Sequence, residues 1–223
     1  MMKQVDKPPL RDEEIVVSVG SVSVTGHLTI PQQPAGVVVF AHGCGSSRHS
    51  PRNRYVARVL NDAGFATVLL DLLTPDEERD RHNVFDIPLL ASRLVNTTGW
   101  LATQPDTAAL PIGYFGASTG AGAALAAAAH PGVKVAAVVS RGGRPDLAGD
   151  LLRHVQSPTL LIVGGRDETV LNLNRQARAV IPVECKIAVV PGATHLFEEA
   201  GTLEQVAMLA RGWFAVHLSP TDA

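Results

Sequence analysis

The chain has 223 residues, of which 46% are hydrophobic and 18% charged, and its formal net charge is −2. This length and composition predict one globular domain with a substantial core. The near-neutral charge argues against a nucleic-acid partner, and the short basic stretch at 48–54 has no interleaved aromatic residues. The two cysteines, Cys44 and Cys185, are too few for a disulfide framework, and no metal-ligand spacing such as C-x-x-C is present.

The N-terminal residues are polar and of mixed charge, and they contain no apolar segment of the signal-peptide type. No stretch approaches the roughly 20 apolar residues that a membrane-spanning helix needs. We therefore expect a flexible segment over residues 1–14, a single domain over residues 15–219, a cytoplasmic location and no contact with membranes.

Apolar runs alternate with helical patterns along the chain, which is typical of a parallel sheet covered by helices. Two alternating segments around Gly20-Ser21 predict a leading hairpin, and six short apolar runs predict further strands. The expected strands are Ile15–Val19, Val22–Ile30, Val37–Ala41, Ala66–Leu70, Ile112–Phe115, Val135–Val139, Thr159–Val163 and Lys186–Val190. The expected helices are Arg52–Ala63, Val84–Thr103, Thr119–His130, Leu147–Val155, Asn172–Ile181 and Leu203–His217.

This order predicts an α/β fold with a mostly parallel eight-stranded sheet and helices on both faces. The connections are short, and residues 140–147 leave no room for a large lid. We expect a shallow, open site unless another subunit covers it, in a monomer or a homodimer.

The sequence Gly-Ala-Ser-Thr-Gly at 116–120 lies between a predicted strand and an Ala-rich predicted helix. A nucleophile elbow needs this order of strand, strained turn and helix, with small residues on both sides of the serine. Gly116 and Gly120 permit a close approach of strand and helix. Ser118 is therefore the candidate nucleophile, and the alternative is a tightly packed helix start that Ser118 only caps.

A serine hydroxyl needs a neighbouring base before it can act as a nucleophile. His195 and Asp167 each follow a predicted strand, so they lie at the same edge of the sheet as Ser118, in the chain order serine, acid, histidine. We expect His195 to be the base and Asp167 to orient it. Glu168 is the rival acid, and a solvated loop position is the alternative for His195.

An oxyanion hole needs two backbone N–H donors. The residue after the nucleophile, Thr119, supplies one of them, and the glycine-rich loop after the strand Val37–Ala41 is expected to supply the other through Cys44. The Cys44 thiol is a less favoured alternative nucleophile, because this residue is not on an elbow.

These residues resemble the dienelactone hydrolase family of α/β-hydrolases, and the resemblance extends from the hairpin to the last helix. Its most specific stretches are HGCGSSRHSPRN at 42–53, GYFGASTG at 113–120 and SRGGRP at 140–145. They are similar to a small branch of bacterial proteins, some of which are fused to a phosphoribosyltransferase domain. The resemblance implies the α/β-hydrolase fold and hydrolysis of carboxylic esters.

The chain departs from the family's namesake enzymes at two positions. Those enzymes carry cysteine at the elbow and a glutamate near it, whereas this chain has Ser118 and no acidic residue over 42–51. The resemblance therefore implies ester hydrolysis in general and argues against dienelactone itself as the substrate.

Two arginines follow predicted strands at the expected site. Arg141 follows Val135–Val139, and Arg48 follows the strand before the oxyanion loop. Because guanidinium groups bind carboxylates with two parallel hydrogen bonds, we expect one of them to hold an acidic group of the substrate. The alternative is that they pair with loop carboxylates such as Asp71 or Asp146.

The sequence therefore predicts a serine hydrolase that cleaves a small-molecule ester through an acyl-enzyme, without metal or other cofactor. The alternatives on the same three residues are a thioesterase, a peptidase or an acyltransferase. A non-catalytic binding module on this fold is a further alternative.

Overall fold

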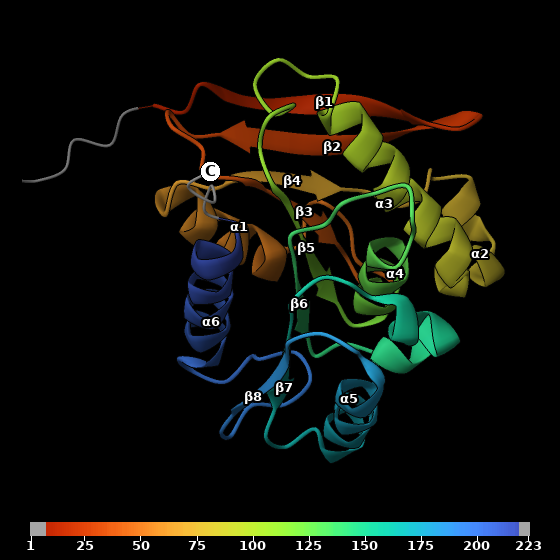
Figure 1. Cartoon of the computed structure of the whole chain (residues 1–223), viewed down its shortest axis with the longest axis vertical. Coiled ribbons are helices and arrows are strands. Elements are labelled where there is room, and N and C mark those ends of the chain that lie inside the picture. The colour runs from red at the N-terminus through yellow and green to blue at the C-terminus, as the bar shows by residue number, and fades with distance from the viewer. Residues whose placement is uncertain (1–7, 219–223) are drawn as a thin grey trace, which may run out of the picture.

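The structure, a computed structural model, describes residues 8–218 and is built around one eight-stranded sheet (Figure 1). The strands lie in the order β1-β2-β4-β3-β5-β6-β7-β8, with β1 and β2 antiparallel and the remainder parallel to one another. Their bounds are β1 Arg11–Val19, β2 Val22–Ile30, β3 Val37–Ala41, β4 Ala66–Leu70, β5 Ile112–Ala117, β6 Ala137–Arg141, β7 Thr159–Gly164 and β8 Cys185–Val190. The predicted mostly parallel eight-stranded sheet is confirmed.

Helices cover both faces of this sheet (Figure 1). The α-helices are α1 Pro51–Asp62, α2 Arg81–Phe85, α3 Ile87–Leu101, α4 Thr119–Ala128, α5 Glu168–Val180 and α6 Thr202–His217, and the 3-10 helices are η1 Glu77–Arg79 and η2 Pro145–His154. One face packs against α3, α4 and α5, and the other packs against α1 and α6.

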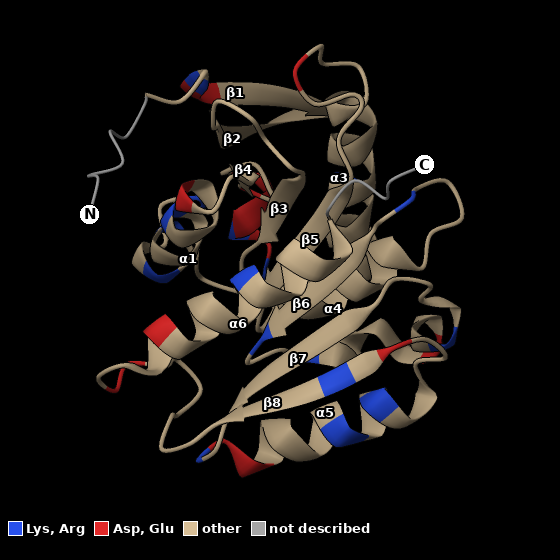
Figure 2. Ribbon diagram, turned by 60° about the vertical axis from the view of Figure 1, so that its left-hand side comes forward, with Lys and Arg blue, Asp and Glu red and all other residues tan. Residues whose placement is uncertain are grey.

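The inner strands are continuous apolar runs because both of their sides are buried, as in β3. All five of its residues are buried, and alternate side chains enter opposite cores: Val37 and Val39 pack on the α3–α4 side, whereas Val38 and Phe40 pack on the α1–α6 side. Charged residues lie mainly on α1, α5 and α6 and at the start of β1, and most of the sheet is uncharged (Figure 2). The hydrophobic cores on the two faces fix the position of the sheet, and with it the edge that carries the candidate residues.

The N-terminal expectation is wrong in part, because β1 begins at Arg11 rather than at Ile15. Residues 11–14 are paired in register with residues 27–30 of β2, so the ladder extends past the apolar part of the strand. Of their side chains, Asp12 bonds to His27 and Thr29 of β2, Arg11 pairs with Glu13, and Glu14 pairs with Arg48. Such polar residues carry no strand signal in the sequence. Residues 1–7 of the expected flexible segment, and residue 219 of the expected domain, lie outside the described residues.

Other predicted elements also differ from the structure: α5 begins at Glu168 rather than Asn172, and β5 ends at Ala117 rather than Phe115. The predicted helix Leu147–Val155 is a 3-10 segment with a kink, because Gly149 adopts φ 54° and ψ −136°. The predicted helix Val84–Thr103 is divided at Asp86, whose carboxylate caps α3 by accepting the Leu89 N–H. Strand β6 ends two residues later than predicted and therefore includes Arg141.

Candidate active site

Ser118 lies at the turn between β5 and α4, in a backbone conformation that side-chain-bearing residues rarely adopt. Its φ is 51° and its ψ is −121°, which is the strained geometry of a nucleophile elbow. Two glycines make the turn possible: a Cβ on Gly120 would collide with the carbonyl oxygens of Ala41 and His42, and one on Gly116 would collide with the Ala121 backbone. The sequence prediction of a strand, elbow and helix is confirmed at this position.

His195 and Asp167 come from two loops at the same edge of the sheet and meet Ser118 there. The His195 Nε2 atom lies 3.3 Å from Ser118 Oγ, and Nδ1 lies 2.7 Å from the Asp167 carboxylate. Asp167 lies in the short turn between β7 and α5, and its other carboxylate oxygen accepts the Val170 N–H and caps α5. This capping bond fixes the carboxylate and leaves its second oxygen facing the imidazole.

The rival acid is in a different position. Glu168 is the first residue of α5 and is exposed, whereas the Asp167 side chain is 15% exposed and the His195 side chain 37% exposed. The imidazole therefore has one nitrogen on a carboxylate and the other on a hydroxyl, and it remains accessible to solvent. This arrangement permits proton transfer between Ser118 and a molecule entering from outside.

The loop after β3 lies against the elbow. The Cys44 N–H donates to the Thr119 hydroxyl at 2.9 Å, and a Cβ on Gly43 would lie 3.0 Å from the Ser118 Cβ. The two backbone groups predicted as oxyanion donors therefore belong to residues in direct contact. The Cys44 side chain is exposed, and the imidazole contacts the serine rather than this thiol.

His42 is a residue of this loop that the sequence reasoning missed. It is buried, and its Nε2 accepts the Leu72 N–H at 3.2 Å while Nδ1 donates to the Gly43 carbonyl at 3.0 Å. Because the Leu72 N–H is a donor, the proton of the neutral ring lies on Nδ1. His42 thus joins the loops after β3 and β4, and its position directly at the end of β3 was the signal available in the sequence.

A hollow of about 960 Å³ opens over Ser118, with His195, Thr119 and Cys44 among the residues that line it. Its far wall comes from the connection between β4 and α3, which contributes residues between Leu72 and Leu90. No sequence pattern predicts this wall, because the segment over residues 71–86 is polar and partly irregular. It narrows the site without forming a separate lid domain.

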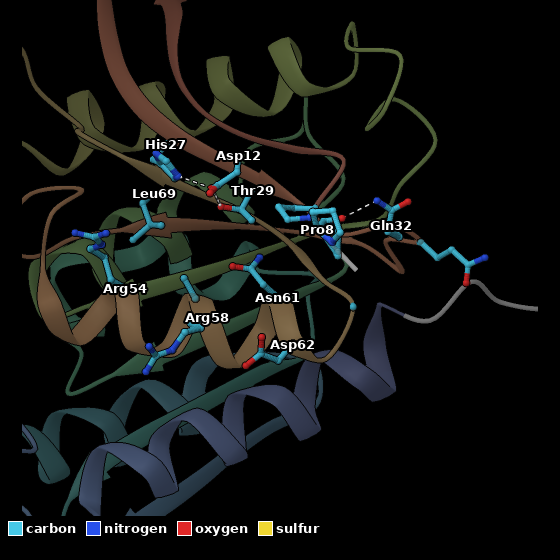
Figure 3. Close-up of a pocket in the computed structure, with 15 residues that line it drawn as sticks. Pro8, Asp12, His27, Thr29, Gln32, Arg54, Arg58, Asn61, Asp62 and Leu69 are labelled. Atoms are coloured by element: carbon cyan, nitrogen blue, oxygen red, sulfur yellow. Dashed lines mark hydrogen bonds and ion pairs between the residues drawn. The ribbon is translucent and has the colours of Figure 1, made fainter. Parts of the chain in front are cut away.

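A second hollow of about 720 Å³ lies between the β1–β2 hairpin and α1 (Figure 3). Some of its polar groups are paired with one another: Asp12 accepts from His27 at 2.8 Å and from Thr29 at 2.9 Å. None of the three residues that meet at the elbow lines it. We therefore place the candidate active site in the hollow over Ser118.

Neither a metal site nor a membrane span appears in the part of the chain that the structure describes. No group of three or more His, Cys, Asp or Glu side chains within residues 8–218 is arranged to hold a metal ion. The helices within the same range are too short or too polar to span a bilayer.

Comparisons with known proteins agree on the fold. The model of the dienelactone hydrolase family matches residues 24–215. The chain belongs to the dienelactone hydrolase family. A solved dienelactone hydrolase from Anabaena variabilis is 56% identical, with a TM-score of 0.92 over 95% of this chain and all of that one. The predicted α/β-hydrolase fold is thereby confirmed.

Other relatives extend this picture. The esterase Est1E from Butyrivibrio proteoclasticus is 14% identical, with a TM-score of 0.75 over 92% of this chain and 98% of that one, which is a likeness of fold. Two Mycobacterium tuberculosis proteins, each named a "putative phosphoribosyl transferase", are 74% identical over 211 residues. That match covers 95% of this chain and 48% of each relative, so the chain spans about half of their length.

The two arginines expected to bind substrate differ in their surroundings in this dienelactone hydrolase family member. Arg48 forms ion pairs with Asp71 and Glu14, and its backbone N–H also donates to Asp71, so it serves to join the β3 loop to β4 and β1. Arg141 lines the hollow over Ser118. Asp146, the other carboxylate considered for it, pairs with Arg144 instead at 2.7 Å.

Proposed function

We propose that this chain is a serine hydrolase that cleaves a carboxylic ester through an acyl-enzyme. The observation that carries the proposal is the continuous chain of contacts from Asp167 through His195 to Ser118, with distances of 2.7 and 3.3 Å. A serine hydroxyl, a neutral imidazole and a carboxylate in this order are the elements of nucleophilic acyl transfer. The strained φ of Ser118 supports the same role, because strain of this kind collects at functional sites.

In the first half of the reaction, Ser118 Oγ attacks the ester carbonyl while His195 Nε2 takes its proton. The negative oxygen of the tetrahedral intermediate accepts hydrogen bonds from the N–H groups of Thr119 and Cys44, and the Cys44 N–H exchanges its bond to the Thr119 hydroxyl for this oxygen. Collapse of the intermediate breaks the bond to the alcohol, which leaves with the proton from His195. Asp167 keeps the imidazole in the tautomer that can accept the serine proton and stabilises its cationic form.

In the second half, His195 removes a proton from a water molecule, which attacks the acyl-enzyme. The acyl–oxygen bond to Ser118 breaks, the proton returns to the serine, and the carboxylic acid is released. The exposed face of His195 supports this step, because water reaches the imidazole from the hollow. The reaction uses only groups of this chain, its substrate and water.

The same three residues also support attack on a thioester or an amide, or transfer of the acyl group to an acceptor other than water. A thioesterase, a peptidase and an acyltransferase are therefore the alternatives to the ester hydrolase, and a non-catalytic binding module is a more distant one. We assign the transferase activity in the names of the M. tuberculosis relatives to the half of those proteins that this chain does not match. A small-molecule ester fits the size of the hollow, and we propose no macromolecular partner.

The test is a rapid-mixing experiment with 4-nitrophenyl acetate, followed at the absorbance of 4-nitrophenolate. An acyl-enzyme predicts a burst of product close to one equivalent per chain, and intact mass should show an acetyl group on Ser118. Ser118→Ala should abolish both signals, whereas Ser46→Ala, in the neighbouring loop, should keep the burst. A wild-type chain that turns over esters without any acyl adduct would contradict the mechanism.

A further inference from the structure

Arg141 is the last residue of β6 and lies directly beside the elbow. It pairs with Ala117 in the parallel ladder, and its carbonyl accepts the Ser118 N–H at 3.2 Å. Its side chain lines the hollow over Ser118, together with His195. The backbone of this arginine is therefore fixed to the candidate nucleophile, and its side chain belongs to the same cavity.

The guanidinium of Arg141 has no hydrogen-bond or ion-pair partner among residues 8–218. The residue is 7% exposed, and within residues 8–218 no carboxylate or carbonyl accepts a hydrogen bond from its side chain, whose buried Nε is also unbonded. The comparable buried Arg93 donates to the Val19 carbonyl at 2.5 Å and to the Glu77 carboxylate at 2.6 Å. Arg141 is thus an exception among the buried arginines of this chain.

The charge that acts on Arg141 from the described residues is positive and comes from Arg52, which is itself paired with Glu198 at 3.2 Å. Glu78 lines the same hollow but forms no ion pair with Arg141. Burial and, to a smaller extent, the charge of Arg52 lower the pKa of Arg141 to about 10, so it is still a cation at neutral pH. Arg52 and Pro51, at the N-terminus of α1, line the same hollow, and this end of a helix is electropositive. A buried unpaired cation is costly, and it is retained where an incoming anion completes the site.

From these observations we infer that Arg141 binds an anionic group, a carboxylate or a phosphate, on the ester that Ser118 cleaves. The planar guanidinium offers parallel N–H donors that match the paired oxygens of either anion. The substrate is then an acidic ester whose charged group lies only a few bonds from the scissile carbonyl. This inference rests on the proposed hydrolase function, which it deepens by naming the substrate class.

The first test measures inhibition of 4-nitrophenyl acetate hydrolysis by benzoate and by inorganic phosphate. At least one of these anions should inhibit the wild type competitively. Arg141→Met should raise that inhibition constant roughly 10- to 100-fold, the loss expected for a charged hydrogen-bonded pair. The control Arg175→Met removes the same charge from the exposed surface of α5 and should change the constant less than twofold.

The second test compares charged esters with neutral analogues of similar size. On the alcohol side these are 4-acetoxybenzoate and 4-acetoxyphenyl phosphate against methyl 4-acetoxybenzoate, and on the acyl side monophenyl glutarate against phenyl pentanoate. For the wild type, at least one charged ester should have a KM about tenfold below that of its neutral partner, and Arg141→Met should remove the difference with little change in kcat for the neutral ester. The ester that responds identifies carboxylate or phosphate and the side that carries it.

Stability separates this role from a structural one. Replacing an unpaired buried charge by an apolar side chain, as in Arg141→Met, should leave the melting temperature unchanged or raise it. If Arg141→Met does not fold, Arg141→Lys replaces it in the test, because lysine keeps the positive charge but lacks the paired N–H donors of the guanidinium. Equal KM values for every charged and neutral pair, or equal inhibition of wild type and Arg141→Met, would overturn the inference. If the wild type hydrolyses no ester, the proposed function fails instead, and calorimetric titration of Ser118→Ala with the same two anions still tests Arg141.

Discussion

Asp167 has two duties that a single substitution separates, because one carboxylate oxygen caps α5 and the other binds His195. Asparagine keeps the capping oxygen, so Asp167→Asn should change the free energy of unfolding by less than about 0.5 kcal/mol. It should nevertheless lower kcat by about four orders of magnitude, or roughly 5 kcal/mol in the barrier. The physical reason is that the amide NH₂ group favours the imidazole tautomer with its proton on Nε2, which cannot take the proton of Ser118.

The assay is steady-state hydrolysis of 4-nitrophenyl acetate, run beside urea unfolding of the same preparations. Asp167→Ala should lose the cap as well and cost about 1 kcal/mol of stability. The matched control is Glu168→Gln, one residue further on and exposed, which should keep kcat within twofold. A kcat for Asp167→Asn within tenfold of the wild type, or a large loss in Glu168→Gln, would refute the assignment of the acid.

Three further predictions concern Gly120 and Thr119 at the elbow and the buried Tyr114. Gly120→Ala should lower the free energy of unfolding in urea by about 3 kcal/mol or more, because its Cβ would collide with backbone oxygens. The control is Gly212→Ala in α6, where a Cβ has open space, and it should raise the free energy of unfolding by about 0.5–1 kcal/mol. Equal effects would contradict the close packing at Gly120. Thr119→Val should lower kcat about fivefold at unchanged KM, because the 2.9 Å bond from the Cys44 N–H to the Thr119 hydroxyl aligns the loop that carries this N–H. A faster variant would mean that the hydroxyl instead competes with the oxyanion for this N–H. Burial raises the pKa of Tyr114 from 10.0 to about 12, so the contribution of its protonated hydroxyl to stability is fully present below pH 10 and is lost as pH rises through 12. In urea unfolding over that pH range, the wild type should lose on the order of 3 kcal/mol more stability than Tyr114→Phe. Parallel pH dependences of the two proteins would refute this prediction.

The sequence was sufficient for the elements whose signal is local. The buried strands, the elbow at Ser118 and the loop positions of Asp167 and His195 follow from apolar runs, glycine spacing and the rule that parallel strands end at one edge. The choice between Asp167 and Glu168 agrees with the geometry, because the Asp167 carboxylate contacts the imidazole, whereas Glu168 begins α5 and is exposed.

The sequence was insufficient where distant side chains decide the structure. Arg48 and Arg141 look equivalent in the sequence, yet Arg48 pairs with Asp71, whereas Arg141 pairs with no acid among the described residues 8–218. This difference depends on how the loops pack. The extension of β1 to Arg11 depends on pairing with β2, and polar residues give no strand signal when one side faces solvent. The kink at Gly149 and the wall between β4 and α3 are likewise set by packing rather than by a periodic pattern.

The most direct test of the central claim is the reaction of the purified chain with a fluorophosphonate probe, read by intact mass and peptide mapping. Such probes bond only to serines whose hydroxyl is activated by a neighbouring base. We predict one adduct per chain on Ser118, none on Ser118→Ala, and a strongly slowed reaction for His195→Ala. A folded wild-type chain that takes up no probe, or that carries the adduct on another residue, would contradict the account.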